Sequence, residues 1–436
     1  MRLVYLDNNA TTRVDPRVVQ VMLPFFTEHY GNASSTHAFG TDVAQAMRKA
    51  RQQLQALLGA AFDHEIVYTA SGTEADNTAI LSALATQTGR DEVVTSAVEH
   101  PAVLALCLWL AKERGVKVRV IPVDASGRLD LEAYRRALGP RTAIASIMWA
   151  SNETGTLFPV TQLAELAHAT GALFHTDAVQ AVGKMAIALQ ASEIDMLSLS
   201  GHKLHAPKGI GALYVRHGVR LRPLLRGGHQ ERGRRAGTEN VPAIVGLGRA
   251  AELALACLDE ENSRVCALRD RLECGLLQRL DNAMVTGDTA HRLPNTSNIV
   301  FDGIEGEAIL LLLNRAGIAC SSGSACASGS LEPSHVLRAM QVPYTAAHGA
   351  VRFSLSRENT DADVERVLEV LPGIIDKLRS VSPFRTQAGE TSQARALPWT
   401  HQRAEPFGNP ITRGPGARPL AGLGGAQPYL LDGSSS

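Results

Sequence analysis

A lysine in a polar turn is the first residue of this chain with chemical potential. Lys203 lies in SGHKLH, directly after a buried strand candidate. A lysine at the end of a strand can form a Schiff base, because burial lowers its pKa and frees the amine to attack an aldehyde. A solvated loop lysine is the commoner interpretation of one such residue alone, so the neighbouring motifs must decide between the two.

Three further residues could bind an aromatic ring carrying that aldehyde. Asp177 ends the strand candidate in HTDAVQ, and its carboxylate could keep a pyridine nitrogen protonated, which lets the ring act as an electron sink. Gln180, one helical turn on, and Asn152 in SNETGT could both bind a phenolic oxygen of the ring. The alternatives are a helix N-cap for Asp177 and a turn asparagine for Asn152.

The segment SGTEADN turns a strand candidate into a helix and could hold a phosphate. The amides of Gly72 and Thr73 would be exposed at the helix N-terminus, where anions bind. Ser200 and His202, on either side of the lysine turn, could add side-chain donors to the same phosphate. An ordinary capped helix start and local turn hydrogen bonds are the alternatives.

Two other residues could act on a substrate. His100 follows a strand candidate, and its flat ring could stack on a flat cofactor and carry protons, although a polar filler is the commoner role. Arg352, in VRFSLS, has a planar guanidinium that can bind both oxygens of an amino-acid carboxylate. The alternative role for this arginine is a surface ion pair. Asn32, in GNASS, could assist Arg352.

Cys326 stands in ACSSGSACASGS, a segment rich in glycine and serine. Apolar support is missing there, so we expect the segment to be mobile and the thiol to be accessible, as reactive thiols require. Cys320 lies closer to an apolar run and suits a structural role, although it could compete as an acceptor. The remaining cysteines fall in helical apolar patterns and are predicted to be small buried hydrophobes: Cys107, Cys257, Cys266 and Cys274.

Short apolar runs alternate with amphipathic stretches from about residue 15 to 263, which predicts an α/β fold with a mostly parallel sheet covered by helices. Thr41–Leu58 is a predicted helix, with Thr41 as its cap and Gly59 at its end. Ligands of such sheets bind beyond the carboxyl ends of the strands. The predicted strands are Glu65–Thr69, Glu92–Ala97, Lys117–Val123, Ala143–Ala150, Leu173–Thr176, Met196–Ser200 and Ala212–Val215.

A second, smaller α+β domain is predicted after the long helical stretch Val241 to Asp281, which should break near residues 260–263. It contains the strand candidates Ser297–Phe301 and Ala350–Ser354. We assign residues 15–258 to the large domain, residues 1–14 and 259–381 to the small one, and residues 382–436, rich in Pro and Gly, to a disordered tail.

Charge and composition narrow the function classes. The chain has 43 Lys and Arg residues and 43 Asp and Glu residues. This balanced charge lacks the excess of positive charge that binding to nucleic acid or to an anionic membrane would require. The N-terminus lacks a secretory apolar segment, and the longest aliphatic run, Ile309 to Leu313, is far too short to span a bilayer. We therefore expect a cytoplasmic enzyme that acts on a small molecule or a protein, with no nucleic-acid and no membrane partner.

Taken together, the motifs closely resemble those of the cysteine desulfurases, and most closely the NifS type that serves nitrogenase. Further matching stretches are YLDNNATT, GNASSTHAFG, VEHPAV, RRAGTEN and SSGSACASGSLEPSHVLRAM. Coverage runs from about residue 1 to 381. Ala33 departs from the proline expected in relatives, which removes no functional group, and the tail lies beyond the familiar pattern.

The resemblance implies a homodimeric transferase of fold type I that depends on pyridoxal 5'-phosphate (PLP), with a mostly parallel seven-stranded sheet. Lys203 would hold the cofactor, with His100 on the ring, Asp177 at the pyridine nitrogen, and Gln180 and Asn152 near the phenolic oxygen. The implied phosphate ligands are Gly72, Thr73, Ser200, His202 and, from the neighbouring subunit, Thr238.

The implied reaction takes sulfur from L-cysteine, releases L-alanine and leaves a persulfide on Cys326. Arg352 and Asn32 would bind the substrate carboxylate, and Lys203 and His100 would move protons. An iron–sulfur scaffold protein of the NifU type would accept the sulfur. No catalytic metal is predicted, although Cys326 could ligate a transferred iron–sulfur cluster. A selenocysteine lyase or an aminotransferase of the same fold is the alternative.

Overall fold

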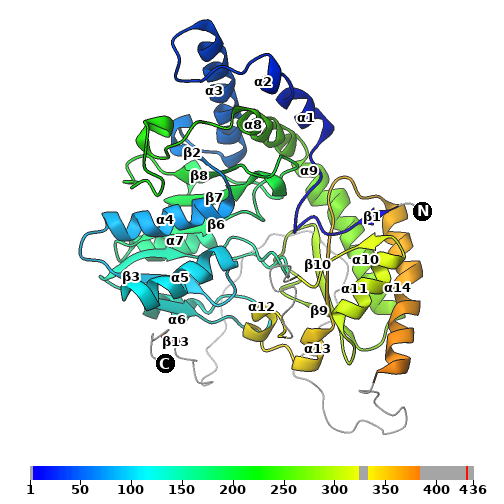
Figure 1. The fold of residues 1–436 in the computed structure, drawn as a ribbon. Helices are drawn as coiled ribbons and strands as arrows, with labels where there is room; N and C mark the ends of the chain where they lie inside the picture. Colours follow the sequence, from blue (N-terminus) through cyan, green and yellow to red (C-terminus); the bar gives the residue numbers. More distant parts are fainter. Residues whose placement is uncertain (1–2, 324–331, 383–428, 431–436) are drawn as a thin grey trace, which may run out of the picture.

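A mostly parallel sheet forms the centre of the larger part of the molecule (Figure 1). The computed structural model describes residues 3–323, 332–382 and 429–430. Strands β4, β3, β5, β6 and β7 run parallel, whereas β8 runs antiparallel to both of its neighbours, β7 and β2. In sheet order the seven strands are β4 (Lys117–Ile121), β3 (Glu92–Ser96), β5 (Thr142–Ser146), β6 (Leu173–Asp177), β7 (Met196–Ser200), β8 (Gly211–Val215) and β2 (Ile66–Thr69).

Helices cover both faces of this sheet, which explains why its strands are apolar along their whole length. Val93 packs into the cluster on one face, with α4 (Gly72–Thr86) and α5 (Pro101–Arg114). Val94, the next residue, packs into the cluster on the other face. The helices of that second face are α3 (Ala38–Leu58), α6 (Leu131–Ala137), α7 (Val160–His168) and α8 (Val241–Ala256).

A smaller antiparallel sheet lies beside the first part (Figure 1). It consists of β9 (Ala283–Thr286), β10 (Thr296–Phe301) and β12 (Ala350–Ser354), and β1 (Val4–Tyr5) pairs separately with β11 (Ile318–Ala319). One apolar cluster joins these strands to α10 (Cys266–Arg279), α11 (Gly306–Arg315) and α14 (Asp361–Val381). Residues 293, 300 and 350 belong instead to the cluster of the large sheet, so the two parts share core contacts. The predicted domain boundaries stay a prediction.

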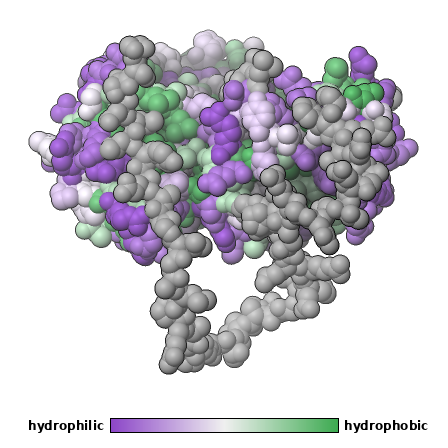
Figure 2. Space-filling model, turned by 90° about the horizontal axis from the view of Figure 1, so that it is seen from below, coloured by the Kyte–Doolittle hydropathy of each residue, from purple (hydrophilic) through white to green (hydrophobic). Residues whose placement is uncertain are grey.

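The remaining elements connect or flank these layers. They are α1 (Pro16–Met22), α2 (Pro24–Thr27), α9 (Leu258–Glu260), α12 (His335–Ala339) and α13 (Tyr344–His348). On the underside of the molecule, hydrophilic and hydrophobic side chains alternate in small patches (Figure 2). That mixed surface is in keeping with a formal net charge of zero.

Both ends of the predicted helix 41–58 can now be compared with the structure. It starts earlier than predicted, at Ala38, with His37 at the N-cap. Thr41 lies inside the helix and its hydroxyl donates to the carbonyl of Ala38, so its assignment as the cap is wrong. Gly59 does end the helix, in the left-handed conformation with φ 57°, which glycine adopts without steric cost.

The long helical stretch after Val241 breaks at Cys257, and five residues of π-helix (Glu261–Val265) follow α9. Within the described residues no single helix meets the length and hydropathy expected of a membrane span. The pair Val241–Ala256 and Leu258–Arg279 meets them only jointly, across a bend of 56°. The first of the two packs against α3 in the protein core.

The prediction of burial for four of the cysteines is only partly matched, and the prediction for the tail stays a prediction. Cys107 is buried, but Cys257 and Cys266 are half-buried and Cys274 is exposed, so the prediction of burial is wrong for Cys274. Cys274 lies on α10, whose opposite side faces the core of the smaller part. Of the tail, the structure describes only β13 (Tyr429–Leu430), which pairs antiparallel with β4 as an eighth strand. Residues 383–428 and 431–436 lie outside the described residues.

Candidate active site

A cavity of about 390 Å³ lies at the carboxyl ends of the parallel strands. Lining residues follow the ends of β2, β3, β5, β6 and β7, and others come from the N-terminal segment and from β12. The structure therefore brings ten of the predicted site residues to one place. They are Gly72, Thr73, His100, Asn152, Asp177, Gln180, Ser200, His202, Lys203 and Arg352.

Lys203 ends a short 3-10 turn, Gly201–Lys203, that follows β7 directly. Its Nζ donates to the main-chain carbonyls of Asn9 (2.5 Å) and Ala10 (2.7 Å). The sequence had suggested the turn but not these partners, which belong to the N-terminal segment. The amine lies at the wall of the cavity, where it could meet a carbonyl carbon that enters the cavity.

Asp177 is the last residue of β6, and its Oδ1 accepts a hydrogen bond from the Val179 amide (2.9 Å). Asp177 therefore also caps the turn that follows β6, which was the alternative role considered for it. Burial raises the pKa of the Asp177 carboxyl, and the nearby His100 and Lys203 charges oppose that shift. A protonated ring nitrogen at this place would supply the positive charge that favours the carboxylate.

A second carboxyl lies behind Asp177. Asp76, on α4, is buried and also lines the cavity, and burial followed by the charge of Asp177 raises its pKa well above the usual value. His175 lies 3.6 Å from it, between the hydroxyls of Ser146 and Ser198 (both 2.9 Å). Burial lowers the pKa of His175 to about 3, so the ring is neutral. Sequence reasoning missed Asp76, because an acid within a helix start is usually a capping residue.

The N-terminus of α4 has the shape that the phosphate prediction requires. Ser71 caps the helix by accepting from the Glu74 amide (3.1 Å), which leaves the amides of Gly72 and Thr73 at the cavity. A Cβ on Gly72 would lie 2.8 Å from Cγ2 of Val179, so only glycine fits between the helix and the β6 connection. Burial, then the charge of Lys203, lowers the pKa of His202 to about 4. Its ring is therefore neutral and carries one N–H, which could donate to a phosphate.

His100 is the N-cap of α5, and its Nδ1 accepts from the Ala102 amide (3.1 Å). This bond places the remaining proton of the neutral imidazole on Nε2. Burial lowers the pKa of His100, and the Lys203 and His335 charges act in the same direction while Asp177 opposes them. The ring therefore can present a neutral N–H to the cavity.

Arg352 lies on β12 and is 2% exposed. Nη2 binds Oδ1 of Asp7 (2.7 Å), and Nη1 donates to the carbonyls of Asn152 (2.9 Å) and Gly323 (3.1 Å). Nε is buried and has no hydrogen-bond partner among the described residues. A buried guanidinium with an unmet donor at the wall of a cavity suits a carboxylate ligand.

Two predicted residues do not reach the cavity, and one lies outside the described residues. Asn32 is exposed, and its Oδ1 accepts from the Ser34 amide (2.9 Å) instead. Thr238 is exposed and does not line the cavity of its own chain, which leaves the predicted contribution from a neighbouring subunit untested. Cys326 belongs to residues 324–331, which the structure does not describe. Cys320 is half-buried against the smaller core, and burial raises the pKa of its thiol, as a structural residue requires.

Asn9 is the residue whose importance the sequence did not reveal. Its carbonyl accepts from Lys203 and from Nε2 of Gln180 (3.0 Å), and its Nδ2 donates to the carbonyl of Asn152 (3.2 Å). The NNATT motif contains the residue, but its partners come from distant segments. Only a three-dimensional arrangement could reveal that it joins three site residues.

The residues present fit PLP. The glycine-only gap at α4 suits a phosphate, the buried Asp177 suits a ring nitrogen, and Lys203 in the same cavity suits an aldehyde. The described residues contain no group of three or more His, Cys, Asp or Glu side chains that could hold a metal ion.

The family model described as aminotransferase class V matches residues 4–367, and the chain belongs to this family, whose members use PLP. A cysteine desulfurase of Gluconacetobacter diazotrophicus is 78% identical over 384 residues, which are 88% of this chain and 96% of the relative. The cysteine desulfurase NifS of Azotobacter vinelandii is 64% identical over 87% of this chain and 94% of its own. Within the class-V family, the chain groups with the cysteine desulfurases.

The fold has a solved counterpart as well. A structure described as a NifS-like protein superposes with a TM-score of 0.81 at 38% identity, covering 86% of this chain and 100% of the other. The expected fold type I architecture is thereby confirmed.

Proposed function

We propose that this chain is a PLP-dependent cysteine desulfurase that removes sulfur from L-cysteine, leaves L-alanine and holds the sulfur as a persulfide on Cys326. The observation that carries the proposal is the convergence of Lys203, Asp177 and Arg352 on one cavity. The names of the relatives support the same activity.

Each residue of the cavity has a distinct part in this reaction. When bound, PLP would supply an aldehyde for Lys203 and a ring that holds the electrons released when the bond from Cα to hydrogen breaks. Arg352, which lines the cavity, would bind the substrate carboxylate through its guanidinium, and Lys203 would take the proton from Cα. His100 would then exchange a proton near the departing sulfur through Nε2.

Sulfur transfer would use the thiolate of Cys326. A bond forms between the two sulfur atoms, the bond from Cβ of the substrate to sulfur breaks, and the electron pair stays on the carbon, which takes a proton to become the methyl of alanine. Gly323 lines the cavity and precedes Cys326 by three residues. Three residues of chain span at most about 11 Å, which is the greatest distance that can separate the Cα atoms of Gly323 and Cys326.

Replacing Cys326 tests this assignment. We expect Cys326→Ala to abolish the persulfide and reduce alanine formation by at least about a hundredfold, while the bound cofactor keeps its colour. Mass spectrometry after exposure to L-cysteine would locate the added sulfur atom. Cys320→Ala is the matched control, because that thiol is half-buried in the same segment.

Sulfide release at the wild-type rate by the Cys326→Ala enzyme would contradict the proposal. An aminotransferase would instead need a keto acid as second substrate and would be indifferent to Cys326. A selenocysteine lyase would release selenium from selenocysteine and leave L-cysteine unchanged. Incubation with L-cysteine and a reductant, scored for sulfide and alanine, separates these possibilities.

We further propose that the chain acts as a homodimer in the cytoplasm and passes its sulfur to an iron–sulfur scaffold protein for nitrogenase. Support for the dimer comes from four exposed apolar side chains near α1 and α2, which are Leu23 (58% exposed), Phe26 (61%), Tyr30 (68%) and Phe39 (54%). Support for the acceptor comes from the resemblance to the NifS type. The acceptor can be identified by following labelled sulfur from Cys326.

A further inference from the structure

Glu153 is a buried acid to which the proposed reaction gives no part. It is 2% exposed, lies in the connection after β5 and lines the active cavity. Its amide donates to Oγ of Ser151 (3.2 Å), and its carbonyl accepts from Nδ2 of Asn298 on β10 (3.3 Å). The main chain here is therefore tied to both parts of the molecule. A glutamate this deeply buried is rare unless its carboxylate has a partner.

The carboxylate of Glu153 lies beside the chain that leads toward Cys326. Gly323 is the last described residue before residues 324–331, and it has φ 94°. A Cβ at Gly323 would lie only 3.3 Å from Oε2 of Glu153, so both the conformation and the close approach favour glycine. The carbonyl of Gly323 accepts from Nη1 of Arg352 (3.1 Å). This end of the segment is thus fixed at the wall of the cavity.

The same carboxylate oxygen binds the chain that returns from that segment. Oγ of Ser334 donates to Oε2 of Glu153 (2.5 Å) and, as the N-cap of α12, accepts from the Val336 amide (3.0 Å). The next residue, His335, lines the cavity and places Nε2 2.9 Å from the carbonyl oxygen of Glu99. Oε2 of Glu153 is therefore the point at which the two ends of the segment meet.

Cys326 stands three residues after one of these ends, Gly323, and eight before the other, Ser334. Bringing the two ends of a loop together costs conformational entropy, which the contacts at the ends must offset. Reaction between two groups also slows steeply when one of them is no longer held close to the other. A contact that only completes the cap of α12 is the alternative role for Glu153.

We infer that Glu153 is a positioning residue that holds both ends of the segment carrying Cys326 at the wall of the cavity, so that the thiol meets the substrate sulfur. The inference rests on the proposed function, because it takes Cys326 as the sulfur acceptor. It deepens that function by giving Glu153 control over sulfur transfer but not over removal of the proton from Cα.

Two rates separate these steps. Exchange of the Cα hydrogen of L-alanine with heavy water needs Lys203 and the cofactor but no thiol, and NMR follows it. Mass spectrometry follows the persulfide on Cys326 after one addition of L-cysteine. For Glu153→Ala we expect persulfide formation to slow at least about tenfold, while Cα exchange stays within about twofold of the wild type.

Glu153→Gln keeps an acceptor oxygen for Ser334 and carries no charge, so we expect it to form persulfide at nearly the wild-type rate. Recovery in this variant assigns the effect to the hydrogen bond. If Glu153→Ala does not fold, Ser334→Ala takes its place, because it removes the donor of the same bond. Circular dichroism verifies the fold of each protein before its rates are measured.

Hydrogen exchange of the cofactor-free protein gives a readout that does not depend on turnover. The amides of residues 336–340 should exchange about tenfold faster in Glu153→Ala than in the wild type, because the return end of the segment loses its partner. The double variant Glu153→Ala/Ser334→Ala should exchange no faster than Ser334→Ala alone, since both changes remove one bond. Additive effects of the two changes would contradict the inference.

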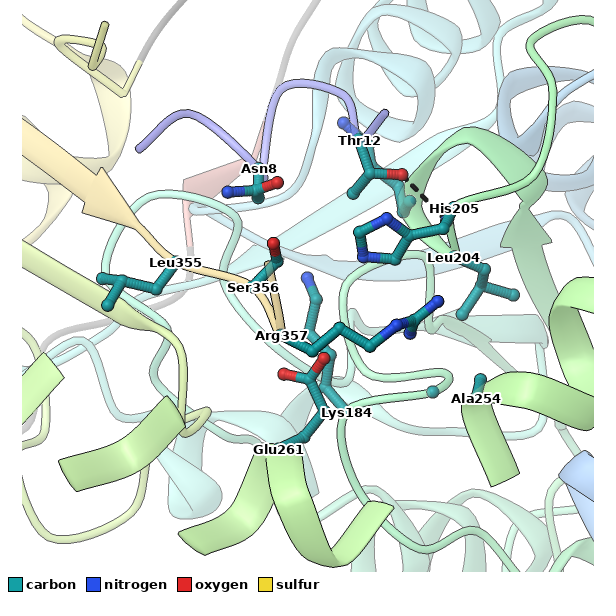
Figure 3. A pocket seen from close by; sticks show the side chains of 12 residues that line it. Asn8, Thr12, Lys184, Leu204, His205, Ala254, Glu261, Leu355, Ser356 and Arg357 are labelled. Carbon is teal, nitrogen blue, oxygen red and sulfur yellow. Dashed lines mark hydrogen bonds between the residues drawn. The ribbon is translucent and has the colours of Figure 1, made fainter. Parts of the chain in front are cut away.

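Glu261→Ala is the matched control, because Glu261 is also a buried acid, 4% exposed, but belongs to a different cavity. Figure 3 shows Glu261 beside the side chains of Lys184 and Arg357, in a very small cavity of about 10 Å³. Lys203 lines that cavity too, so a disturbance there should change both rates alike. We expect the ratio of persulfide formation to Cα exchange to stay at the wild-type value.

Slow persulfide formation with normal Cα exchange in Glu153→Ala, and recovery in Glu153→Gln, supports the inference. Equal loss of both rates overturns it, and so does a Glu153→Gln protein as slow as Glu153→Ala. A wild-type chain that forms no persulfide on Cys326 overturns the proposed function itself. Wild-type persulfide formation with an unaffected Glu153→Ala protein overturns this inference alone.

Discussion

At the scale of single residues, the site combines groups whose pKa values burial shifts toward their neutral forms. Burial lowers the pKa values of His175 and His202 and raises those of Asp76 and Asp177. Such opposed shifts gather at functional sites, because a cofactor or substrate supplies the missing charge on binding. The cavity is therefore prepared for a ligand with both a cationic ring and anionic groups.

Glu99 gives a pH prediction that is independent of catalysis. Burial raises the pKa of its carboxyl to about 8, against hydrogen bonds from Ser96 and Met148 that lower it. The folded chain thus keeps a proton that the unfolded chain loses near pH 4.5, so the free energy of unfolding falls as pH rises from about 4.5 to 8, by at most about 1.4 kcal/mol per pH unit.

Glu99→Gln is expected to remove this slope, because glutamine carries no proton to lose. The measurement is the melting temperature of the wild-type and Glu99→Gln proteins between pH 5 and about 9. Outside this range the titration of other groups dominates the pH dependence of stability. We expect similar values at low pH and a higher melting temperature for the variant at high pH. Parallel curves for the two proteins would show that Glu99 ionises normally.

Residue chemistry predicted much of the site from the sequence alone. Lys203, Asp177 and Arg352 could be found because each follows or occupies a strand whose apolar run is visible in the sequence. Asn9 could not be found, because its partners Lys203, Gln180 and Asn152 come from segments far apart from it in the chain. Polar residues in turns have many uses, and only the fold selects one.

At the scale of elements, the start of α4 is the most tightly constrained part of the site. Its first residue, Gly72, lies where a Cβ would be 2.8 Å from Val179 and 3.5 Å from Cβ of Ser200. Because position 72 is glycine, the helix can approach the connection after β6 more closely than it could with any other residue at that position. Its free amides are aimed at the cavity as a consequence.

Gly72→Ala is expected to weaken the binding of PLP about tenfold, since overpacking at such a contact costs about 1–3 kcal/mol. Adding Val179→Ala should restore most of the loss, because it removes the atom that the new Cβ would meet. Equilibrium dialysis with PLP would measure both variants. A double variant as weak as the single one would show that the new methyl group harms the phosphate site directly.

Strands were easier to predict than helix ends. All seven strands of the large sheet were predicted, since a run buried on both faces is apolar throughout. The predicted start of α3 was wrong for two reasons. His37 is the N-cap but makes no side-chain hydrogen bond to the helix, and Thr41 is a residue type that commonly caps helices. The predicted strand 143–150 ends at Ser146, and the backbone beyond it still bonds to His175 and Asp177 as it leaves the sheet.

At the scale of the whole molecule, the apolar side chains around α1 and α2 predict that a single chain is incomplete. Phe26→Asp should convert a dimer to monomers and weaken the retention of PLP, because Thr238 would no longer reach a neighbouring site. Analytical ultracentrifugation would measure the mass, and Leu311→Asp, at an exposed leucine of α11 (54% against 61% for Phe26), is the control. A Phe26→Asp protein with the mass of the wild type would place the interface elsewhere.

The N-terminal segment, finally, makes the order of synthesis matter. Asn8 donates to the carbonyl of Ser354 (2.9 Å), 346 positions further along the chain, and Asp7 binds Arg352. Asp7 and Asn8 thus find their partners only after residues 352 and 354 have been made, and the adjoining carbonyls that hold Lys203 are placed with them. A nascent chain can fold most of its large sheet earlier, yet the complete cofactor site arises only after β12 has been made.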